Sequence, residues 1–281
     1  MRIALATCVT VPEVDVDAPL LHDALVARGA EVELLAWDDP AARFDADACV
    51  VRSTWNYWLP GNHARFLAWI ERTAKATRLY NPARVLAWNL HKRYLVELER
   101  RGVPVVPTVL LPRGERRSLD DVMRALGSEK VVIKPAVSAG SYRTRMVERR
   151  ELADGEAHLR ALCDDADALV QPYVASVEGW GERSLVCIDG QLMHAVRKNP
   201  RFGGEHESVS AALPIEDDER ALAERALSRV DEPLLYARID MARDDRGQPM
   251  LMELELCEPS LFLAQNPAAL ARFADAIVSR A

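Results

Sequence analysis

Cysteine is scarce in this chain and is not arranged in pairs. Its five cysteines are scattered, and none forms a Cys-x-x-Cys motif; they are Cys8, Cys49, Cys163, Cys187 and Cys257. This pattern argues against a disulfide-stapled fold and a cysteine-based zinc site, because both need closely spaced thiols. We expect reduced, mostly buried thiols in a cytoplasmic protein, and we assign Cys257 no catalytic role.

Long apolar runs are also missing. No segment reaches the roughly 18 apolar residues that span a bilayer, and the opening MRIALATC lacks the basic start and apolar stretch of a signal peptide. The formal net charge is -7, whereas non-specific nucleic-acid binding needs a concentrated basic surface. The sequence therefore predicts a small-molecule partner, with no membrane or nucleic-acid partner.

Lysine is the scarce basic residue. Of the 36 basic residues only five are lysine, namely Lys75, Lys92, Lys130, Lys134 and Lys198. A compact ammonium group suits a phosphate oxygen in a tight site, whereas guanidinium is a wide planar fork. A lysine in this arginine-rich chain is therefore a candidate phosphate ligand.

The pattern of apolar runs predicts an α/β and α+β protein in three parts. Residues 1–85 alternate strand and helix patterns, which predicts a small parallel sheet, but no glycine-rich phosphate fingerprint follows the first strand. Residues 86–175 hold one long helical pattern, a proline-punctuated boundary and a compact central domain. Residues 176–281 hold two hairpins and an antiparallel sheet, the first hairpin turning at Asp189–Gly190.

The second hairpin places charged residues on one face. If LLYARIDMARDDRGQPMLMELEL turns at Arg246–Gly247, facing residue numbers sum to 493. Asp240 then faces Glu253, and Arg238 faces Glu255. Because side chains alternate along a strand, these four share a face. The other face is apolar and carries Ala237, Ile239, Met241, Met252, Leu254 and Leu256.

This cluster predicts a metal site. Like charges directly opposite on neighbouring strands destabilise a sheet, so Asp240 and Glu253 need a cation. Oxygen ligands of this kind suit Mg²⁺ or Mn²⁺, completed by water and phosphate oxygens. The alternative is a solvated strand face neutralised by Arg238, but the third acid in register, Glu255, favours the metal.

Two lysines are phosphate candidates. VVIKPAVSAGS places Lys134 at the end of an apolar strand, before small residues whose backbone amides can approach an anion closely. The alternative is a surface lysine at a tight turn. Lys92 lies within a helical pattern, where a solvated lysine is the simpler interpretation.

The stretch ALVQPYVASVEGWGERS is a nucleotide candidate. Its strand ends in an extended, proline-bearing segment, so backbone groups beyond Gln171 are available to a flat heterocycle. Glu178 or Glu182 then accepts from a sugar hydroxyl. Both acids are equally explained as solvated, and Glu182 is also expected to pair with Arg197 across the first hairpin.

The segment VVRSTWNYW ends the third strand of the first part. Ligands of open parallel sheets bind beyond the carboxyl ends of the strands. The candidates for contact with an acceptor substrate are Arg52, Ser53, Thr54 and Asn56. The neighbouring aromatic residues are expected to pack between lobes; they are Trp55, Tyr57 and Trp58.

Taken in order, the motifs resemble a known family. Lys92 is followed by KPAVSAGS, QPYV, GERSLVCIDG, YARID and MELELCEPS. This order resembles the ATP-grasp ligases, including the D-cycloserine synthetase-like and glutathione synthetase-like members, over most of the chain. VVRSTWNYW and ELELCEPSLF are most similar to the cycloserine synthetase-like branch. The resemblance implies an N-terminal pre-ATP-grasp domain (1–85), a small lid domain (within 86–175) and a C-terminal catalytic domain (176–281).

The resemblance also implies roles for individual residues. Asp240, Glu253 and Glu255 match the positions that hold two magnesium ions, and Arg238 matches an arginine that steadies the transferring phosphoryl group. Contacts with ATP are implied for Lys92, Lys134, Ser138, Gly140, Ser141, Gln171, Tyr173, Val174, Glu178 and Glu182, with Glu178 preferred for the ribose. The chain is shorter than this branch after HAVRKNP, so a basic residue that serves the acceptor is matched to Arg197 or Arg201.

The implied reaction has two steps. A carboxylate attacks the γ-phosphate of ATP to give an acylphosphate, and an amine then displaces phosphate to give an amide, with release of ADP. Two alternatives stay open: an intramolecular ligase that closes a ring, and a non-catalytic ATP-binding sensor or partner module. The substrates are expected to be a small, amino-acid-like carboxylic acid and an amine, and a homodimer is an expectation from the family.

Overall fold

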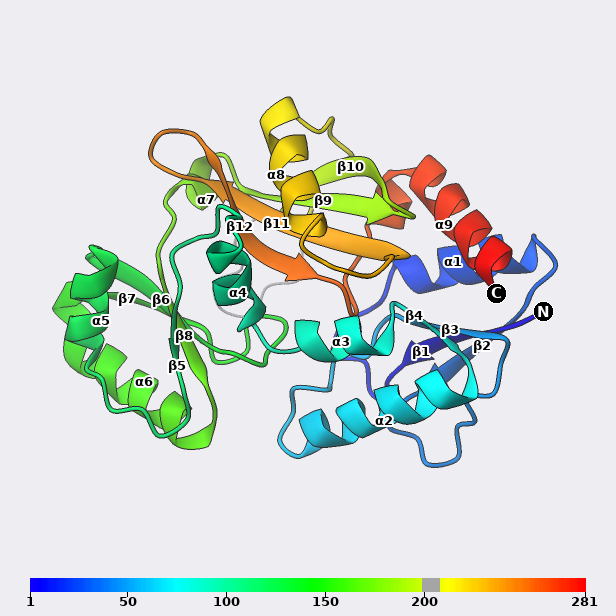
Figure 1. Ribbon diagram of the computed structural model, residues 1–281, viewed down its shortest axis with the longest axis horizontal. Coiled ribbons are helices and arrows are strands. Elements are labelled where there is room, and N and C mark those ends of the chain that lie inside the picture. The colour runs from blue at the N-terminus through cyan, green and yellow to red at the C-terminus, as the bar shows by residue number, and fades with distance from the viewer. Residues whose placement is uncertain (199–207) are drawn as a thin grey trace.

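The protein is built from three lobes, each organised by its own sheet. The computed structural model describes residues 1–198 and 208–281. Figure 1 shows the C-terminal lobe in the centre, with the lid lobe on one side and the N-terminal lobe on the other. Each sheet has four strands, and each lies within one of the three intervals predicted from the sequence. The domain boundaries at 85 and 175 stay predictions.

The N-terminal lobe contains the predicted parallel sheet. Its strands are β1 (Arg2–Thr7), β2 (Glu31–Ala36), β3 (Ala48–Val51) and β4 (Arg78–Tyr80), in the order β2-β1-β3-β4 with parallel neighbours. Helix α1 (Asp17–Val26) and helix α2 (Asn62–Ala76) connect them. Phe66 and Trp69 of α2 are buried against Trp37, so the core on this side of the sheet is largely aromatic.

The linker is two helices, not the single long helix that the sequence pattern predicts. Helix α3 (Ala83–Asn89) ends where its Asn89 side chain hydrogen-bonds the backbone of residues 254 and 256, and α4 (Tyr94–Arg100) starts a new axis. The Lys92 N–H donates to the carbonyl of Ala136 in the lid at 2.8 Å. The break therefore allows hydrogen bonds to backbone groups of the C-terminal lobe and of the lid. It also places Lys92 outside a solvated helix face.

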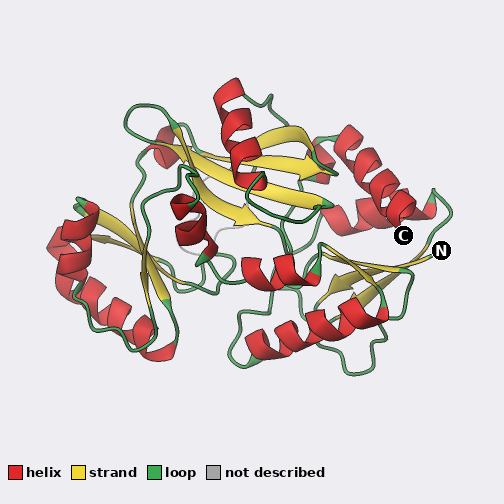
Figure 2. Ribbon diagram, in the orientation of Figure 1, coloured by secondary structure: helices red, strands yellow, loops and turns green. Residues whose placement is uncertain are grey.

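The lid lobe is an antiparallel sheet covered by two helices. Its elements are β5 (Val109–Leu111), α5 (Leu119–Leu126), β6 (Lys130–Pro135), β7 (Arg145–Glu148), the 3-10 turn η1 (Arg149–Glu151), α6 (Leu152–Asp165) and β8 (Ala168–Pro172). Figure 2 shows α5 and α6 on one face of the sheet, whose strand order is β5-β8-β6-β7. Gly155 permits this close packing, because a Cβ there would lie 2.5 Å from Cγ1 of Val147.

The C-terminal lobe carries the two predicted hairpins. Its elements are α7 (Ser176–Gly179), β9 (Glu182–Ile188), β10 (Gln191–Lys198), α8 (Asp217–Leu227), β11 (Tyr236–Arg243), β12 (Pro249–Glu255), the 3-10 turn η2 (Leu263–Gln265) and α9 (Pro267–Arg280). The strand order is β10-β9-β11-β12, with antiparallel neighbours. The first hairpin turns at Asp189–Gly190, as predicted, with φ of 51° and 74°.

The N-terminal and C-terminal lobes share a core, whereas the lid has its own. Leu21 of α1, Phe273 of α9 and Tyr236 of β11 belong to one buried cluster, and Figure 1 shows α9 beside α1. The lid residues form a separate cluster around Leu159 and Ile133. All five cysteines are buried and free, as predicted. Among the described residues, no helix is long and apolar enough to cross a bilayer.

Candidate active site

The β11–β12 hairpin has the predicted register where the charged residues lie. Asp240 pairs with Glu253, and Arg238 pairs with Glu255. The turn was predicted incorrectly: Asp244 pairs with Gln248, so three residues lie between them, with Gly247 at a φ of 77°. A bulge between Asp240 and Met241 then shifts the register by one residue and cancels the effect of the longer turn.

The bulge also places Leu251 in the core where the sequence pattern predicted Met252. Leu251 pairs with Met241 and is fully buried, whereas Met252 is the extra residue and is only partly buried. The prediction of Met252 as a core residue was wrong for this reason. The other predicted apolar positions on this face, from Ala237 to Leu256, do belong to one buried cluster. The hairpin is therefore apolar on one face and charged on the other.

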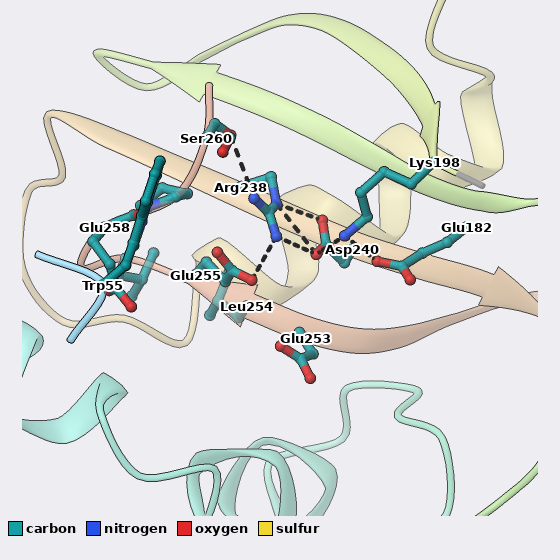
Figure 3. Close-up of polar contacts among 12 residues, drawn as sticks. Trp55, Glu182, Lys198, Arg238, Asp240, Glu253, Leu254, Glu255, Glu258 and Ser260 are labelled. Carbon is teal, nitrogen blue, oxygen red and sulfur yellow. Dashed lines mark hydrogen bonds and ion pairs between the residues drawn. The ribbon is translucent and has the colours of Figure 1, made fainter. Parts of the chain in front are cut away.

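Arg238 lies at the centre of the charged face. Its Nε donates to Oδ1 of Asp240 at 2.9 Å, and its Nη2 donates to Oδ2 of Asp240 at 2.8 Å and to Oε1 of Glu255 at 2.5 Å (Figure 3). Its guanidinium carbon also lies 5.7 Å from the ring centroid of Phe262. These contacts hold a buried guanidinium in one orientation, which a flexible point charge would not achieve.

Lys134 and Lys92 converge on the second acid of the hairpin. Nζ of Lys134, from the lid, donates to Oε1 of Glu253 at 2.7 Å, and Nζ of Lys92, from the linker, lies 3.6 Å from Oε2 of the same residue. Lys92 also donates to the carbonyl of Ser138 at 2.9 Å. The lid, the linker and the C-terminal lobe thus meet at the Glu253 carboxylate. Neither lysine lies on a solvated surface.

Lys198 joins the acid cluster, although the sequence analysis gave it no role beyond that of a scarce lysine. A bulge between Leu192 and His194 shifts the first hairpin by one residue, so Lys198 faces Glu182 and Arg197 faces Arg183. The predicted pairing of Glu182 with Arg197 was therefore wrong. Nζ of Lys198 donates to Oδ2 of Asp240 at 2.8 Å and forms an ion pair with Glu182 (Figure 3).

Arg197 and Arg201 are the two basic residues proposed to serve the acceptor substrate. The Arg197 side chain is exposed and packs over Gly181, away from the acid cluster, since a Cβ on Gly181 would lie 2.4 Å from Cγ of Arg197. Arg201 lies outside the described residues. The scarcity of lysine was the available signal for Lys198. Three of the other lysines, Lys92, Lys130 and Lys134, contact residues of the lid or of the C-terminal lobe, and only Lys75 is an exposed residue of α2.

The electrostatics of the cluster differ from acid to acid. Burial opposes ionisation of Glu253, but Lys134 and Lys92 hold its pKa at about 2. The pKa of Asp240 is likewise lowered, against burial, by Arg238 and Lys198. Burial raises the pKa of Glu255 to about 8, with Asp240 and Glu253 adding to the rise. Glu255 is thus the acid whose charge is least compensated by the protein.

The predicted nucleotide contacts line the junction of the lid and the C-terminal lobe. Gln171 is buried and its Nε2 donates to Oγ1 of Thr108 at 2.9 Å. The Tyr173 hydroxyl donates to Glu178 at 2.6 Å, and Nζ of Lys130 lies 3.8 Å from the Tyr173 ring centroid. Val174 follows at the start of the connection to α7. Glu182 is engaged by Lys198, whereas the Glu178 side chain is 60% exposed and lies 3.7 Å from Nζ of Lys130. The contact of Glu178 with a sugar hydroxyl stays a prediction.

The lid loop that follows β6 reaches back toward the linker. Ser138 is buried, and its hydroxyl donates to the carbonyl of Pro135 at 3.2 Å. Gly140 and Ser141 both have positive φ, of 58° and 60°. Tyr142, just beyond them, packs on Trp58 of the N-terminal lobe with ring centroids 4.2 Å apart. The loop predicted to cover the phosphates therefore touches two other parts of the chain.

Three of the four acceptor candidates after β3 form side-chain hydrogen bonds within the protein. Nη1 of Arg52 donates to the carbonyl of Pro259 at 3.1 Å, and the side chain is 2% exposed. The Ser53 hydroxyl hydrogen-bonds that of Thr7 at 2.9 Å. The Asn56 amide accepts from Trp37 and donates to Asp38, both at 2.7 Å. Thr54 is fully buried. These residues shape the wall between the lobes, and their contact with a substrate stays a prediction.

The donor set fits magnesium, although the carboxylates are drawn toward protein cations. In the part of the chain that the structure describes, no three His, Cys, Asp or Glu side chains converge closely enough to hold an ion as they stand. Protein Mg²⁺ sites commonly use one or two carboxylates and take the remaining oxygens from water and phosphate. The Glu253 and Glu255 side chains are 23% and 27% exposed, which leaves oxygens accessible for such a shared site.

Comparisons with known proteins agree with this geometry. A family model described as the N-terminal domain of D-cycloserine synthetase DcsG matches residues 3–81. Cycloserine biosynthesis protein DcsG of Streptomyces lavendulae is 33% identical over 295 residues, which cover 99% of this chain and 98% of that protein. The crystal structure of D-cycloserine synthetase DcsG superposes with a TM-score of 0.90 and 32% identity, over 100% of this chain and 99% of that chain.

A more distant solved structure shares the fold. A structure of the ATP-grasp ligase PsnB with Mg, ADP and a variant of its minimal precursor superposes with a TM-score of 0.66 at 19% identity, over 99% of this chain and 98% of that chain. The three-lobed arrangement is thus that of an ATP-grasp enzyme. The extent and identity of the match to the cycloserine protein settle the relationship: this chain belongs to the D-cycloserine synthetase family of ATP-grasp ligases.

Proposed function

We propose that this ligase activates the carboxyl group of a small, amino-acid-like acid as an acylphosphate and joins it to an amine nitrogen, using ATP and magnesium. The observation that carries the proposal is the convergence on Glu253. Lys134 from the lid and Lys92 from the linker both contact Glu253, which lies on the acidic face of the β11–β12 hairpin. A site in which cations and acids predominate suits phosphoryl transfer, in which positioning and charge stabilisation dominate.

The residues of this chain divide the work. Lys92 and Lys134 exchange Glu253 for phosphate oxygens and neutralise their charge. Arg238, fixed by Asp240 and Glu255, stabilises the phosphoryl group as it passes to the substrate carboxylate and then the tetrahedral centre formed by the amine. Packing of the lid loop against the N-terminal lobe excludes water from the acylphosphate, which water would otherwise hydrolyse.

Magnesium would be held by Asp240, Glu253 and Glu255. When bound, it supplies positive charge to the phosphate oxygens of ATP, and the three acids supply enough oxygens for two ions shared with the nucleotide. The same ligands accept Mn²⁺. The lysine contacts with Glu253 described above give way when nucleotide and metal bind, whereas Arg238 stays hydrogen-bonded to Asp240 and Glu255, whose oxygens have further lone pairs for the metal.

Ring closure within one molecule is the second candidate. It is favoured by the relative that matches almost the whole chain, which is a cycloserine biosynthesis protein, and by the TM-score of 0.90 to a D-cycloserine synthetase. In this version the amine belongs to the same molecule as the activated carboxyl. Turnover with one substrate, against a requirement for two, separates the versions.

The test is ADP formation and isotope transfer with defined probes. The purified enzyme is incubated with ATP, MgCl₂, hydroxylamine and a panel of D- and L-amino acids that includes alanine, serine and 2,4-diaminobutyrate. We expect ADP, a hydroxamate, and transfer of one ¹⁸O from the labelled carboxyl to phosphate per turnover. If 2,4-diaminobutyrate gives ADP and a lactam without hydroxylamine, closure is intramolecular. ATP binding without ADP formation across the panel would contradict both versions and favour a non-catalytic sensor.

A further inference from the structure

A cleft of about 530 Å³ lies beyond the carboxyl ends of the first three strands of the N-terminal sheet. The loops after β1, β2 and β3 line it with apolar and polar side chains, among them Trp55, Trp58, Asp38 and Asn56. Clefts of roughly 300–1,000 Å³ hold small molecules, and open parallel sheets bind their ligands at this edge. The size and position of the cleft therefore suit the acid substrate.

Trp58 is shared by this cleft and by the lid. It lines the cleft, and its ring lies against the Tyr142 ring of the lid loop, with centroids 4.2 Å apart and 33° between the ring planes. Both residues are partly buried, and Trp58 also packs against the buried cluster that contains Tyr57 and Phe66. A ligand in the cleft would therefore contact the same indole that the lid loop contacts.

The lid loop that carries Tyr142 is held at both ends. On one side, Nζ of Lys92 donates to the carbonyl of Ser138 at 2.9 Å. On the other side, Nη1 of Arg143 donates to Oδ2 of Asp165 in α6 at 2.8 Å. Between these anchors the backbone makes a tight turn with two successive positive φ values. The position of the Tyr142 ring is therefore linked to that of the loop predicted to cover the ATP phosphates.

The lid has a core of its own. Its buried cluster around Leu159 is distinct from the cluster shared by the N-terminal and C-terminal lobes. Contacts of the lid loop with the N-terminal lobe include the Tyr142–Trp58 pair and Val137, which packs against the cluster containing Phe66. Because an element with its own core can move as a unit, a few contacts of this kind decide between its open and closed positions.

We propose that Trp58 makes closure of the lid loop depend on substrate in the cleft. The acid substrate packs against the indole from the side of the cleft and holds it in the orientation that Tyr142 meets, so bound substrate favours the closed lid. The proposal rests on the ligase function above and adds an order to it, because the nucleotide is enclosed only when an acid is present to receive the phosphoryl group. Trp58 and Tyr142 are then positioning residues that act through the lid loop. By linkage, acid and nucleotide must raise each other's affinity by the same factor.

The test measures how strongly the acid and the nucleotide assist each other in binding. Titration calorimetry gives the Kd of the non-hydrolysable analogue AMPPNP with MgCl₂, with and without a saturating amount of the most active acid of the panel. For the wild-type enzyme we expect the acid to lower this Kd at least about fivefold, the lower end of typical coupling. Trp58→Ala should reduce the factor by about 2- to 5-fold, which is within the contribution of one aromatic pair.

Tyr142→Ala removes the same ring pair from the side of the lid and should give the same loss of coupling. The double variant should lose no more than either single variant, because a contact can be removed only once. Tyr142→Phe keeps the ring and should retain the wild-type factor. Met146→Ala, at an exposed position of β7 in the lid, is the matched control and should also retain it.

During turnover with hydroxylamine, both alanine variants should release about 2- to 5-fold more ADP per hydroxamate than the wild-type enzyme. Under an open lid, water attacks the acyl carbon of the acylphosphate, and the free acid and phosphate are released. A wild-type factor of one, full coupling in both alanine variants, or additive losses in the double variant would overturn the inference and leave the ligase function intact. Absence of ADP formation by the wild-type enzyme with every acid would overturn both.

Discussion

The two hairpins of the C-terminal sheet have similar bulges, but the bulges have opposite consequences for the predicted registers. In β9–β10 the turn has the expected two residues. The bulge after Leu192 therefore shifts the pairing of β10 with β9 by one residue beyond that point, and it brings Lys198 opposite Glu182. In β11–β12 the turn is one residue longer than expected, and the bulge at Met252 restores the register. Each bulge lies between the turn and the charged end of its hairpin.

The difference between the two hairpins shows that strand register decides which side chains lie on the charged face. Because side chains alternate, a slip of one residue moves a side chain to the other face. In the first hairpin the slip selects a lysine over an arginine for the site. In the second hairpin the cancellation keeps Arg238, Asp240, Glu253 and Glu255 together. Bulges are enriched next to active sites for this reason, since they re-aim side chains without changing the fold.

The largest effect is expected at Arg238, which the second hairpin places at the centre of the site. Arg238→Ala should lower kcat about 100- to 1,000-fold, because it removes an oriented donor at the phosphoryl group. Arg238→Lys keeps the charge but loses the fork that binds Asp240 and Glu255 together, so it should recover little activity. Steady-state ADP release measures both variants. Recovery of wild-type kcat by the lysine variant would contradict the orienting role.

The register of the first hairpin is tested by a matched pair of neighbours. Lys198→Ala leaves Asp240 and Glu182 without their shared cation and should lower kcat/KM by about 10- to 100-fold. Arg197→Ala removes an exposed side chain and should change kcat/KM by less than about threefold. Both are measured by ADP release at saturating ATP. The reverse order of effects would mean that the bulged register does not operate in the working enzyme.

A smaller effect, on stability, separates the two acids of β12. The pKa of Glu255 is raised from 4.5 to about 8, so the folded state holds this proton more tightly than the unfolded chain. Its contribution to stability is present below about pH 4.5 and is lost as the pH rises toward 8. Glu255→Gln avoids that loss. Without nucleotide and metal, its Tm relative to wild type should increase between pH 5 and 8.

Glu253→Gln is the matched control for that experiment. The pKa of Glu253 is lowered to about 2, so its contribution to stability is fully present above about pH 4.5 and is lost only in acid. Its glutamine variant should be less stable than wild type by a constant amount from pH 5 to 8. Thermal unfolding across this range measures both variants. If the two variants gave parallel curves of Tm against pH, the pKa values of Glu253 and Glu255 would not differ as described.

Sequence reasoning succeeded where the pattern was periodic. The alternation of MELELCEP predicted a strand with one acidic and one apolar face, and the motif order predicted the fold. It failed where the chain interrupts its period for tertiary reasons. Lys92 lies in a helical pattern, but the helix breaks because Asn89 binds the backbone of β12 and Lys92 binds the lid.

The central claim is that the acid face of the β11–β12 hairpin holds magnesium for phosphoryl transfer. A crystal structure of the enzyme with ADP and MgCl₂ tests it most directly. We predict Mg²⁺ at about 2.0–2.1 Å from oxygens of Asp240, Glu253 and Glu255, with Lys92 and Lys134 moved from Glu253 onto the phosphates. Nucleotide bound with its magnesium away from all three acids, and both lysines still on Glu253, would contradict the claim.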